Sequence, residues 1–156
     1  MSVRDRACLL ALVITAVLAW PSATRAGTCT VSSVSPVAFG SYDVFDPAPV
    51  DSTGSITIDC TDIVAEDVVR VDLDAGASGT FAARTLVSGA LTMIYGLYLD
   101  AAHTLVWGDG TGGSSTYGPV HPAEGPTTLT IYGRIPGNQD VGGGVYADTI
   151  TVTLQF

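Results

Sequence analysis

The chain has 156 residues and is acidic: six Arg, no Lys and fifteen Asp or Glu give a formal net charge of −9. A surface of this sign repels phosphate backbones and anionic lipid headgroups, which excludes nucleic acid and a charged membrane surface as expected partners. Gly, Ser and Thr, rather than Lys and Glu, dominate the polar stretches, a composition typical of exported β proteins.

The first 26 residues have the pattern of a secretory signal peptide. Two Arg precede an apolar run from Ala7 to Trp20, and the small residue Ala26 suits signal peptidase. The run is short for a membrane span, although an uncleaved anchor remains the alternative. We expect cleavage before Gly27, export to the periplasm and then the cell surface, and one domain over residues 27–156.

Two cysteines, Cys29 and Cys60, follow the expected cleavage site, because Cys8 leaves with the signal peptide. In an oxidising compartment they are expected to form a disulfide, which would stabilise the fold by roughly 3 to 4 kcal/mol. Two free buried thiols are the alternative. No Cys-x-x-Cys spacing is present, so we expect neither a metal site nor a redox site.

Apolar residues alternate with polar ones along most of residues 27–156, which predicts β-strands. Residues 52–54 are predicted to form a turn, 81–86 a short extended piece, and 106–125 a loop or hairpin. No stretch has helical spacing. The expected fold is all-β, an immunoglobulin-like antiparallel sandwich of about six main strands. These strands are predicted at residues 29–34, 56–60, 69–74, 91–99, 127–135 and 147–156.

The last predicted strand has no following turn and no strand after it. Ile150, Val152, Leu154 and Phe156 share one face, with small or polar residues between them. A sheet edge of this kind must be covered by something else, so we expect the sandwich to lack its last strand.

A set of short motifs, in this order, resembles the spore coat protein U domain family over nearly all of residues 27–156. Each motif alone is weak, whereas the ordered set is specific. The motifs are Cys29 with Phe39-Gly40-Ser41-Tyr42, Gly54-Ser55-Ile56-Thr57-Ile58-Asp59-Cys60, Arg84, Tyr95-Gly96-Leu97-Tyr98, Trp107-Gly108-Asp109-Gly110, Tyr132-Gly133-Arg134-Ile135 and Gly144-Val145-Tyr146-Ala147-Asp148-Thr149.

The resemblance implies a subunit of an archaic chaperone–usher surface fibre, with roles in adhesion and biofilm formation. A periplasmic chaperone, and after the outer-membrane usher a neighbouring subunit, would supply the missing strand. Only two residues separate the expected cleavage site from Cys29, whereas polymerising relatives carry a longer donor segment there. We therefore expect a terminal subunit that accepts a strand without donating one. The expected donor-strand groove comprises Val31, Ile150, Val152, Leu154 and Phe156.

Other candidate sites are weaker, and we expect no enzyme, no catalytic residue, no cofactor and no small-molecule substrate. The two histidines, His103 and His121, lie in loop-like stretches without a nucleophilic serine motif. Trp107, Asp109 and Tyr117 lie in a glycine-rich stretch that could form a surface-binding loop for glycan, or else a hairpin with the Trp packed inside.

Two alternative functions remain open from the sequence. One is a coat or matrix protein of the spore or cell surface that does not polymerise by strand exchange. The other is a small glycan-binding adhesin that uses the Trp107 loop. Asp72 and Asp74, two residues apart, are expected to be a solvated strand face rather than a carboxylate pair. Arg84 and Arg134 are expected to bind a carboxylate or a loop carbonyl.

Overall fold

The computed structural model describes residues 26–156, so the predicted signal peptide up to Arg25 lies outside the described residues. Within residues 26–156 the only helix is the 3-10 turn η1, Gly76–Ser78, and no helix of this part is long and apolar enough to cross a bilayer. The strands are β1 (Thr28–Ser35), β2 (Val50–Thr61), β3 (Val69–Leu73), β4 (Arg84–Ser88), β5 (Leu91–Tyr98), β6 (Tyr117–Val120), β7 (Gly125–Ile135) and β8 (Val152–Gln155).

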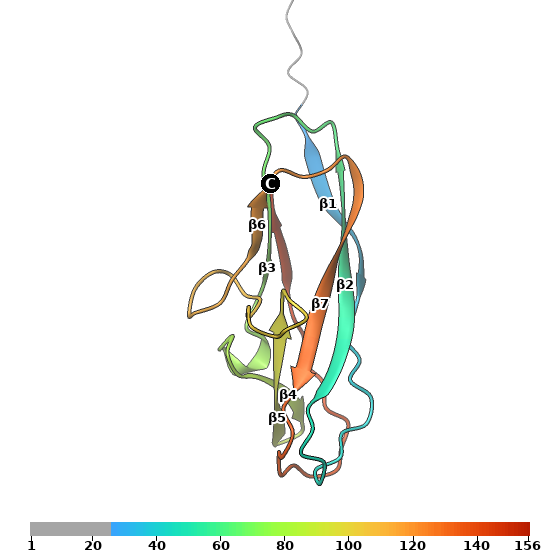
Figure 1. The fold of residues 1–156 in the computed structure, drawn as a ribbon, viewed down its shortest axis with the longest axis vertical. Helices are drawn as coiled ribbons and strands as arrows, with labels where there is room; N and C mark the ends of the chain where they lie inside the picture. The colour runs from blue at the N-terminus through green and yellow to red at the C-terminus, as the bar shows by residue number, and fades with distance from the viewer. Residues whose placement is uncertain (1–25) are drawn as a thin grey trace, which may run out of the picture.

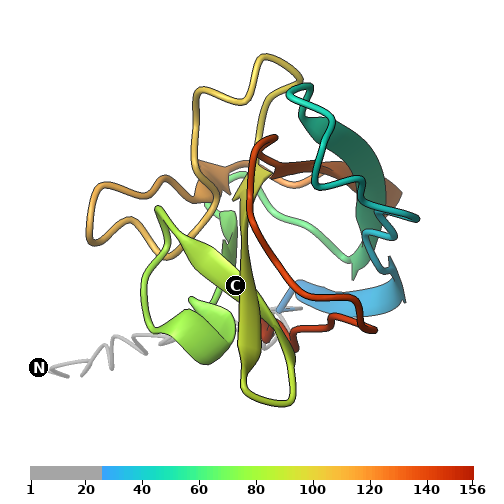
Figure 2. The same cartoon turned by 90° about the horizontal axis from the view of Figure 1, so that it is seen from below.

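The strands form two antiparallel sheets, as the all-β sandwich prediction requires. One sheet has the order β1-β2-β7-β5-β4, and the other has the order β6-β3-β8. The molecule is elongated along the strands (Figure 1), and an end-on view shows the strands surrounding one interior (Figure 2). Long pairing between β2 and β7, from Val50↔Ile135 to Cys60↔Gly125, forms the centre of the larger sheet.

The core is made by the inward faces that alternation predicts. Arg70 and Asp72 lie on the other face of β3, between the buried apolar residues of that strand. The buried apolar side chains are Cys29, Ile56, Ile58, Cys60, Val69, Val71, Leu73, Met93, Tyr95, Leu97, Trp107, Leu129, Ile131 and Ile135. Cys29 and Cys60 are directly opposite each other in the β1–β2 pair and form the expected disulfide, with an S–S distance of 2.05 Å.

The strand order is that of a constant-type immunoglobulin sandwich with one strand absent among the described residues. β1, β2, β7 and β5 take the places of strands A, B, E and D, while β3 and β8 take those of C and F. In the complete fold, strand G pairs with the free side of F. Within residues 26–156, β8 pairs with β3 on one side, and no strand pairs with its other side.

Several strand boundaries differ from the sequence-based prediction. The extended piece predicted at 81–86 is β4, Arg84–Ser88. Residues 52–54 are not a turn, because β2 begins at Val50 and Gly54 pairs with Ile131 of β7. The stretch predicted as a loop or hairpin, 106–125, contains the short strand β6, which pairs with β3 and not within its own stretch. Turn-forming residue types were outweighed here by pairing with a neighbouring strand.

The last strand is shorter than predicted because the chain changes sheets. Ala147 bridges Val87 of the larger sheet, with N···O distances of 2.8 and 3.1 Å. Asp74 then donates its N–H to the carbonyl of Thr151, and β8 continues along β3. Residues 147–151 therefore cross from one layer to the other, and only Val152–Gln155 forms regular ladder pairing.

Candidate functional site: the groove between β1 and β8

The free edge of β8 presents apolar side chains that the domain itself does not finish burying. Val152 and Leu154 pair with Leu73 and Val71 of β3 and point into the core, yet both stay half-buried. Phe156 is 47% exposed. Because Val152 and Leu154 lie on the core face, their partial exposure does not result from an outward orientation.

The inner face of β1 has the same property. Val31 is opposite Ile58, and Val34 is opposite Ile56, both of which are fully buried. A bulge at Ser32, whose hydroxyl donates to the carbonyl of Thr57, inserts one extra residue, so valines three positions apart still face the core. Nevertheless Val31 is 37% and Val34 is 52% exposed.

β1 and β8 approach each other at one end and separate towards the other. A Cβ placed on Gly27 would lie 3.0 Å from the Phe156 ring, so the start of β1 touches the end of β8. At the opposite end, the segments 37–44 and 141–148 line a pocket of about 830 Å³. We call the whole depression, from Gly27 and Phe156 to this pocket, the groove.

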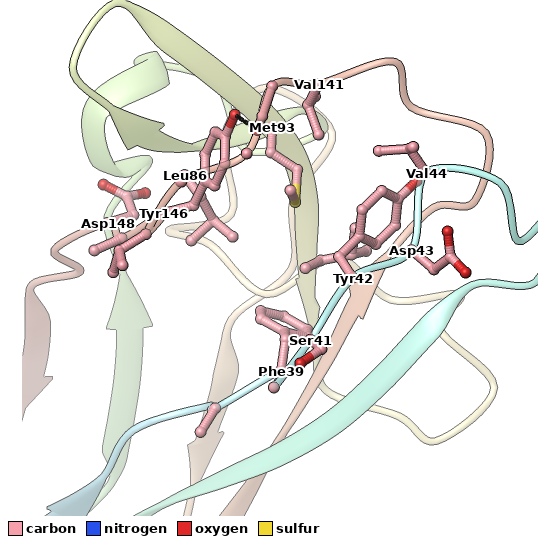
Figure 3. Close-up of a pocket in the computed structure, with 18 of the residues that line it drawn as sticks. Phe39, Ser41, Tyr42, Asp43, Val44, Leu86, Met93, Val141, Tyr146 and Asp148 are labelled. Atoms are coloured by element: carbon pink, nitrogen blue, oxygen red, sulfur yellow. Dashed lines mark hydrogen bonds between the residues drawn. The ribbon is translucent and has the colours of Figure 1, made fainter.

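The pocket at the wide end of the groove has a mixed lining, in which apolar and polar surface contribute about equally. Figure 3 shows Phe39 and Tyr42 on one side, Tyr146 on the other, and Leu86 and Met93 towards the interior. These side chains pack against the core and remain partly accessible, except for Met93, which is 4% exposed. An extended segment with alternating apolar side chains would fill such a depression.

Two glycines position the side of the groove that continues from β1. A Cβ on Gly133 would lie 2.6 Å from Val37 and 2.8 Å from Phe39, and a Cβ on Gly54 would lie 2.6 Å from the carbonyl oxygen of Ser35. Without side chains at these two inward positions of β7 and β2, Val37 and Phe39 pack directly on the sheet. Both glycines belong to the motifs noted in the sequence, but no sequence pattern revealed this packing role.

A partly buried polar network fixes the segment that leads into β8. The Tyr95 hydroxyl donates to the Asp148 carboxylate at 2.7 Å, and the other carboxylate oxygen accepts the N–H of Ala77 at 3.0 Å. Burial and this hydrogen bond to a carboxylate raise the pKa of Tyr95, so the hydroxyl stays a donor. The network joins β5, η1 and the segment before β8.

Arg84 supports the same region from inside the core. Its guanidinium is fully buried and donates to the carbonyls of Asp74, at 2.6 Å, and Trp107, at 2.7 Å. Burial lowers the pKa of Arg84, although nearby Tyr95 and acidic groups oppose this shift. The expectation of a carbonyl-binding Arg is confirmed here. Arg134 forms the other expected contact, two hydrogen bonds of 2.6 and 2.7 Å to the Asp51 carboxylate.

Comparison with known proteins identifies the family. The spore coat protein U domain profile matches residues 14–153. The chain belongs to the spore coat protein U domain family. A protein named Protein U, from Myxococcus xanthus, is 27% identical over 144 residues, which cover 83% of this chain and 78% of that protein.

A solved structure has a similar fold. The match is to a chain of the CsuC-CsuE chaperone-tip adhesion subunit pre-assembly complex, from the archaic chaperone-usher Csu pili of Acinetobacter baumannii. The TM-score is 0.58 at 21% sequence identity, over 84% of this chain. The match spans 40% of the length of that solved chain, so the likeness concerns the domain fold.

Among the spore coat protein U motifs, the Trp107 motif is structural in this chain. Trp107 is fully buried and its indole N–H donates to the carbonyl of Val71 at 2.9 Å. Of the two alternatives for this stretch, the one with the Trp packed inside is therefore found, and Trp107 is not a surface-binding residue. Asp109 is half-buried; its carboxylate accepts from Thr111, and its carbonyl accepts from Arg70. Tyr117 is in β6 and packs against the core.

The remaining candidate residues do not form a reactive site. His103 lies between the rings of Tyr98 and Tyr132, with Nε2 3.8 Å from Asp51, and His121 contacts the carbonyl of Asp67. Within residues 26–156, no three His, Cys, Asp or Glu side chains gather as metal ligands would.

Asp72 and Asp74, which were expected to form a solvated strand face, have different surroundings in the structure. Asp72 is 6% exposed and binds Arg70 at 2.8 Å and the amide of Gln155 at 3.0 Å. Asp74 instead accepts the N–H of Gly76 through its side chain. The prediction of a solvated face is therefore wrong for Asp72, because Arg70 and the strand partner Gln155 cover its carboxylate.

Proposed function

We propose that this spore coat protein U domain is a subunit of a chaperone–usher surface fibre and accepts a strand from another molecule in the groove between β1 and β8. The observation that carries the proposal is the free edge of β8, with half-exposed core-facing side chains on both sides of the groove. The position beside β8 is the one that strand G occupies in a complete immunoglobulin sandwich.

The energy available from strand insertion is large for a domain of this size. Val31, Val34 and Phe156 still expose between 37% and 52% of their surface, and Ile150, Val152 and Leu154 are also partly exposed. Covering the remaining exposed surface of each of the six side chains would contribute roughly 1 kcal/mol, or roughly 6 kcal/mol for the set, before backbone hydrogen bonds are counted. Since domains are stable by about 5 to 15 kcal/mol, the added strand would change the stability of the subunit substantially.

The expected partners follow from this role. A periplasmic chaperone would supply the first strand, the outer-membrane usher would exchange it, and a neighbouring subunit would supply the final one. The solved relative comes from a complex of a chaperone with a tip adhesion subunit, which supports a chaperone as partner. No catalysis is part of this function.

A terminal position in the fibre is the finer part of the proposal. Cleavage before Gly27 would leave two residues ahead of Cys29, too few to fill the groove of a neighbour. Mass spectrometry of the exported protein measures the cleavage site directly. A mature chain that starts a dozen or more residues earlier, or that forms long polymers by itself, would contradict the terminal position.

Co-expression with candidate periplasmic chaperones, followed by purification of a complex, tests strand acceptance. Leu154→Asn places an amide on the groove face of β8 and is expected to reduce complex recovery strongly. Thr153→Asn is the matched control, because Thr153 is exposed and faces away from the core opposite Asp72. Equal recovery of both variants would contradict the proposal.

A coat or matrix protein that does not exchange strands is the second candidate. The description of the family, Spore Coat Protein U domain, favours it. It predicts that no chaperone is retained by the wild-type chain. It also predicts that peptides with alternating apolar residues leave the melting temperature unchanged.

A further inference from the structure

Two large apolar side chains stand out from all others on the described surface. Phe45 is 90% and Val145 is 89% exposed, whereas the other exposed large apolar residues within residues 26–156 lie between 37% and 52%. Both are next to the pocket. Val145 lines it, and Phe45 directly follows Val44, which also lines it. Leaving two such side chains in water contributes nothing to the stability of the isolated domain.

The backbones that carry these two side chains are held in place. The N–H of Phe45 donates to the Asp43 carboxylate at 2.9 Å, in a turn closed by Asp46 N–H to the Asp43 carbonyl at 3.2 Å. Beside Val145, the Tyr146 hydroxyl donates to the carbonyl of Gly142 at 2.7 Å. The exposure of both side chains is therefore part of ordered loops.

The direction of the groove places both residues at one end of it. The narrow end is closed by Gly27 and Phe156, and the wide end opens between the segments 37–44 and 141–148. A polypeptide lying beside β8 that continues beyond the groove can leave at the wide end, between the Phe45 loop and the Val145 loop. The surface of these loops is continuous with the groove.

The charges of the wide end indicate what chemistry would fit there. The segments 36–49 and 136–149 contain Asp43, Asp46, Asp140 and Asp148 and neither Lys nor Arg. The first three are exposed. An apolar residue accompanied by Lys or Arg would match this surface, and an acidic segment would be repelled.

We propose that Phe45 and Val145 bind the part of the strand-donating partner that lies just outside the groove, an apolar segment with Lys or Arg beside it. This inference rests on the proposed strand acceptance and adds a second contact to it. The inserted strand supplies alternating apolar side chains to the groove, and the adjoining segment decides which donor is preferred.

Synthetic peptides test this on the mature protein. One peptide is an alternating Thr-Ile strand of about twelve residues. Two others carry the extension Leu-Lys-Leu-Lys on this strand, one at its N-terminus and one at its C-terminus. A further pair carries Leu-Glu-Leu-Glu at the same two positions. One Lys-containing peptide is expected to bind about tenfold or more tighter than the plain strand. Its Glu-containing counterpart should lose that advantage.

The variant Phe45→Ser is expected to remove most of the gain from the extension and to leave binding of the plain strand unchanged, because Phe45 does not line the pocket. Val145→Ser is expected to remove the gain as well, and because Val145 lines the pocket it is compared with Phe45→Ser on the extended peptides only. Val68→Ser is the matched control, because Val68 is 52% exposed and lies just before β3, outside both loops of the wide end. Val68→Ser should preserve the higher affinity of the Lys-containing extended peptide.

Three results would overturn the inference. If the plain strand binds and neither extension improves its affinity, the two loops do not contact the partner, while strand acceptance stands. If Phe45→Ser and Val145→Ser bind every peptide as the wild type does but lose retention on a hydrophobic resin, these side chains face a different target. If no peptide binds, strand acceptance itself fails, and this inference fails with it.

Discussion

The glycine at position 54 allows a sharp test of how the groove is built. In Gly54→Ala the new Cβ would lie 2.6 Å from the carbonyl oxygen of Ser35 and 2.9 Å from the backbone N of Val37. Both contacts are to backbone, so the chain from Ser35 to Val37 has to move. Overpacking of this kind costs about 1 to 3 kcal/mol, and the lower chain entropy of unfolded Ala returns about 0.4 to 1 kcal/mol.

The net loss of about 1 to 2 kcal/mol would lower the melting temperature by roughly 4 to 10 °C for a domain of this size. Trp107 is the only Trp after the expected cleavage site and is fully buried, so its fluorescence reports the transition. Gly143→Ala is the control, because nothing lies within 4 Å of its added Cβ and its φ is not left-handed. Equal shifts for both variants would refute the packing argument.

Three further outcomes are expected. Replacing both disulfide cysteines by Ser should lower the free energy of unfolding, measured by urea denaturation, by roughly 3 to 4 kcal/mol, because the bridge closes a loop of 31 sequence steps. An unchanged urea midpoint would contradict this. Tyr95→Phe removes the 2.7 Å hydrogen bond to Asp148 and should cost about 1 to 2 kcal/mol in the same assay. The hydrogen bond from the backbone N–H of Leu105 lowers the pKa of Asp100 from its ordinary value of 3.8. The stabilisation of the fold by the ionised Asp100 carboxylate is therefore fully present above pH 3.8 and is lost as the pH falls through the lower, folded-state pKa. Asp100→Asn should therefore make the melting temperature less sensitive to pH between about 5 and 2.

Alternation along the chain was sufficient to predict most of the core. Ile56 and Ile58, Val69 and Val71, and Leu129 are buried on the faces that their spacing indicates. These residues lie in strands with one buried face, where a period of two has a single interpretation. The disulfide partners also followed from the sequence, since only two cysteines remain after the expected cleavage site.

Features that depend on a distant neighbour could not be predicted in this way. Gly54 resembles a turn residue, but it is an inward strand position that makes room for Val37. The glycines around Trp107 left both an exposed and a packed indole open, and only the structure shows that the indole is buried and donates to a β3 carbonyl. The wide end of the groove combines segments about one hundred residues apart, which no local pattern brings together.

The four edge strands of the two sheets in residues 26–156 differ in how easily another strand could pair with them, and this affects how many partners each molecule can bind. β4 is bridged by Ala147, and β6 is only four residues long and contains Pro119, which has no N–H to offer. The outer sides of β1 and β8 border the same groove. Each molecule would then accept one incoming strand, so a subunit that accepts a strand without donating one would cap a single fibre and create no branch point.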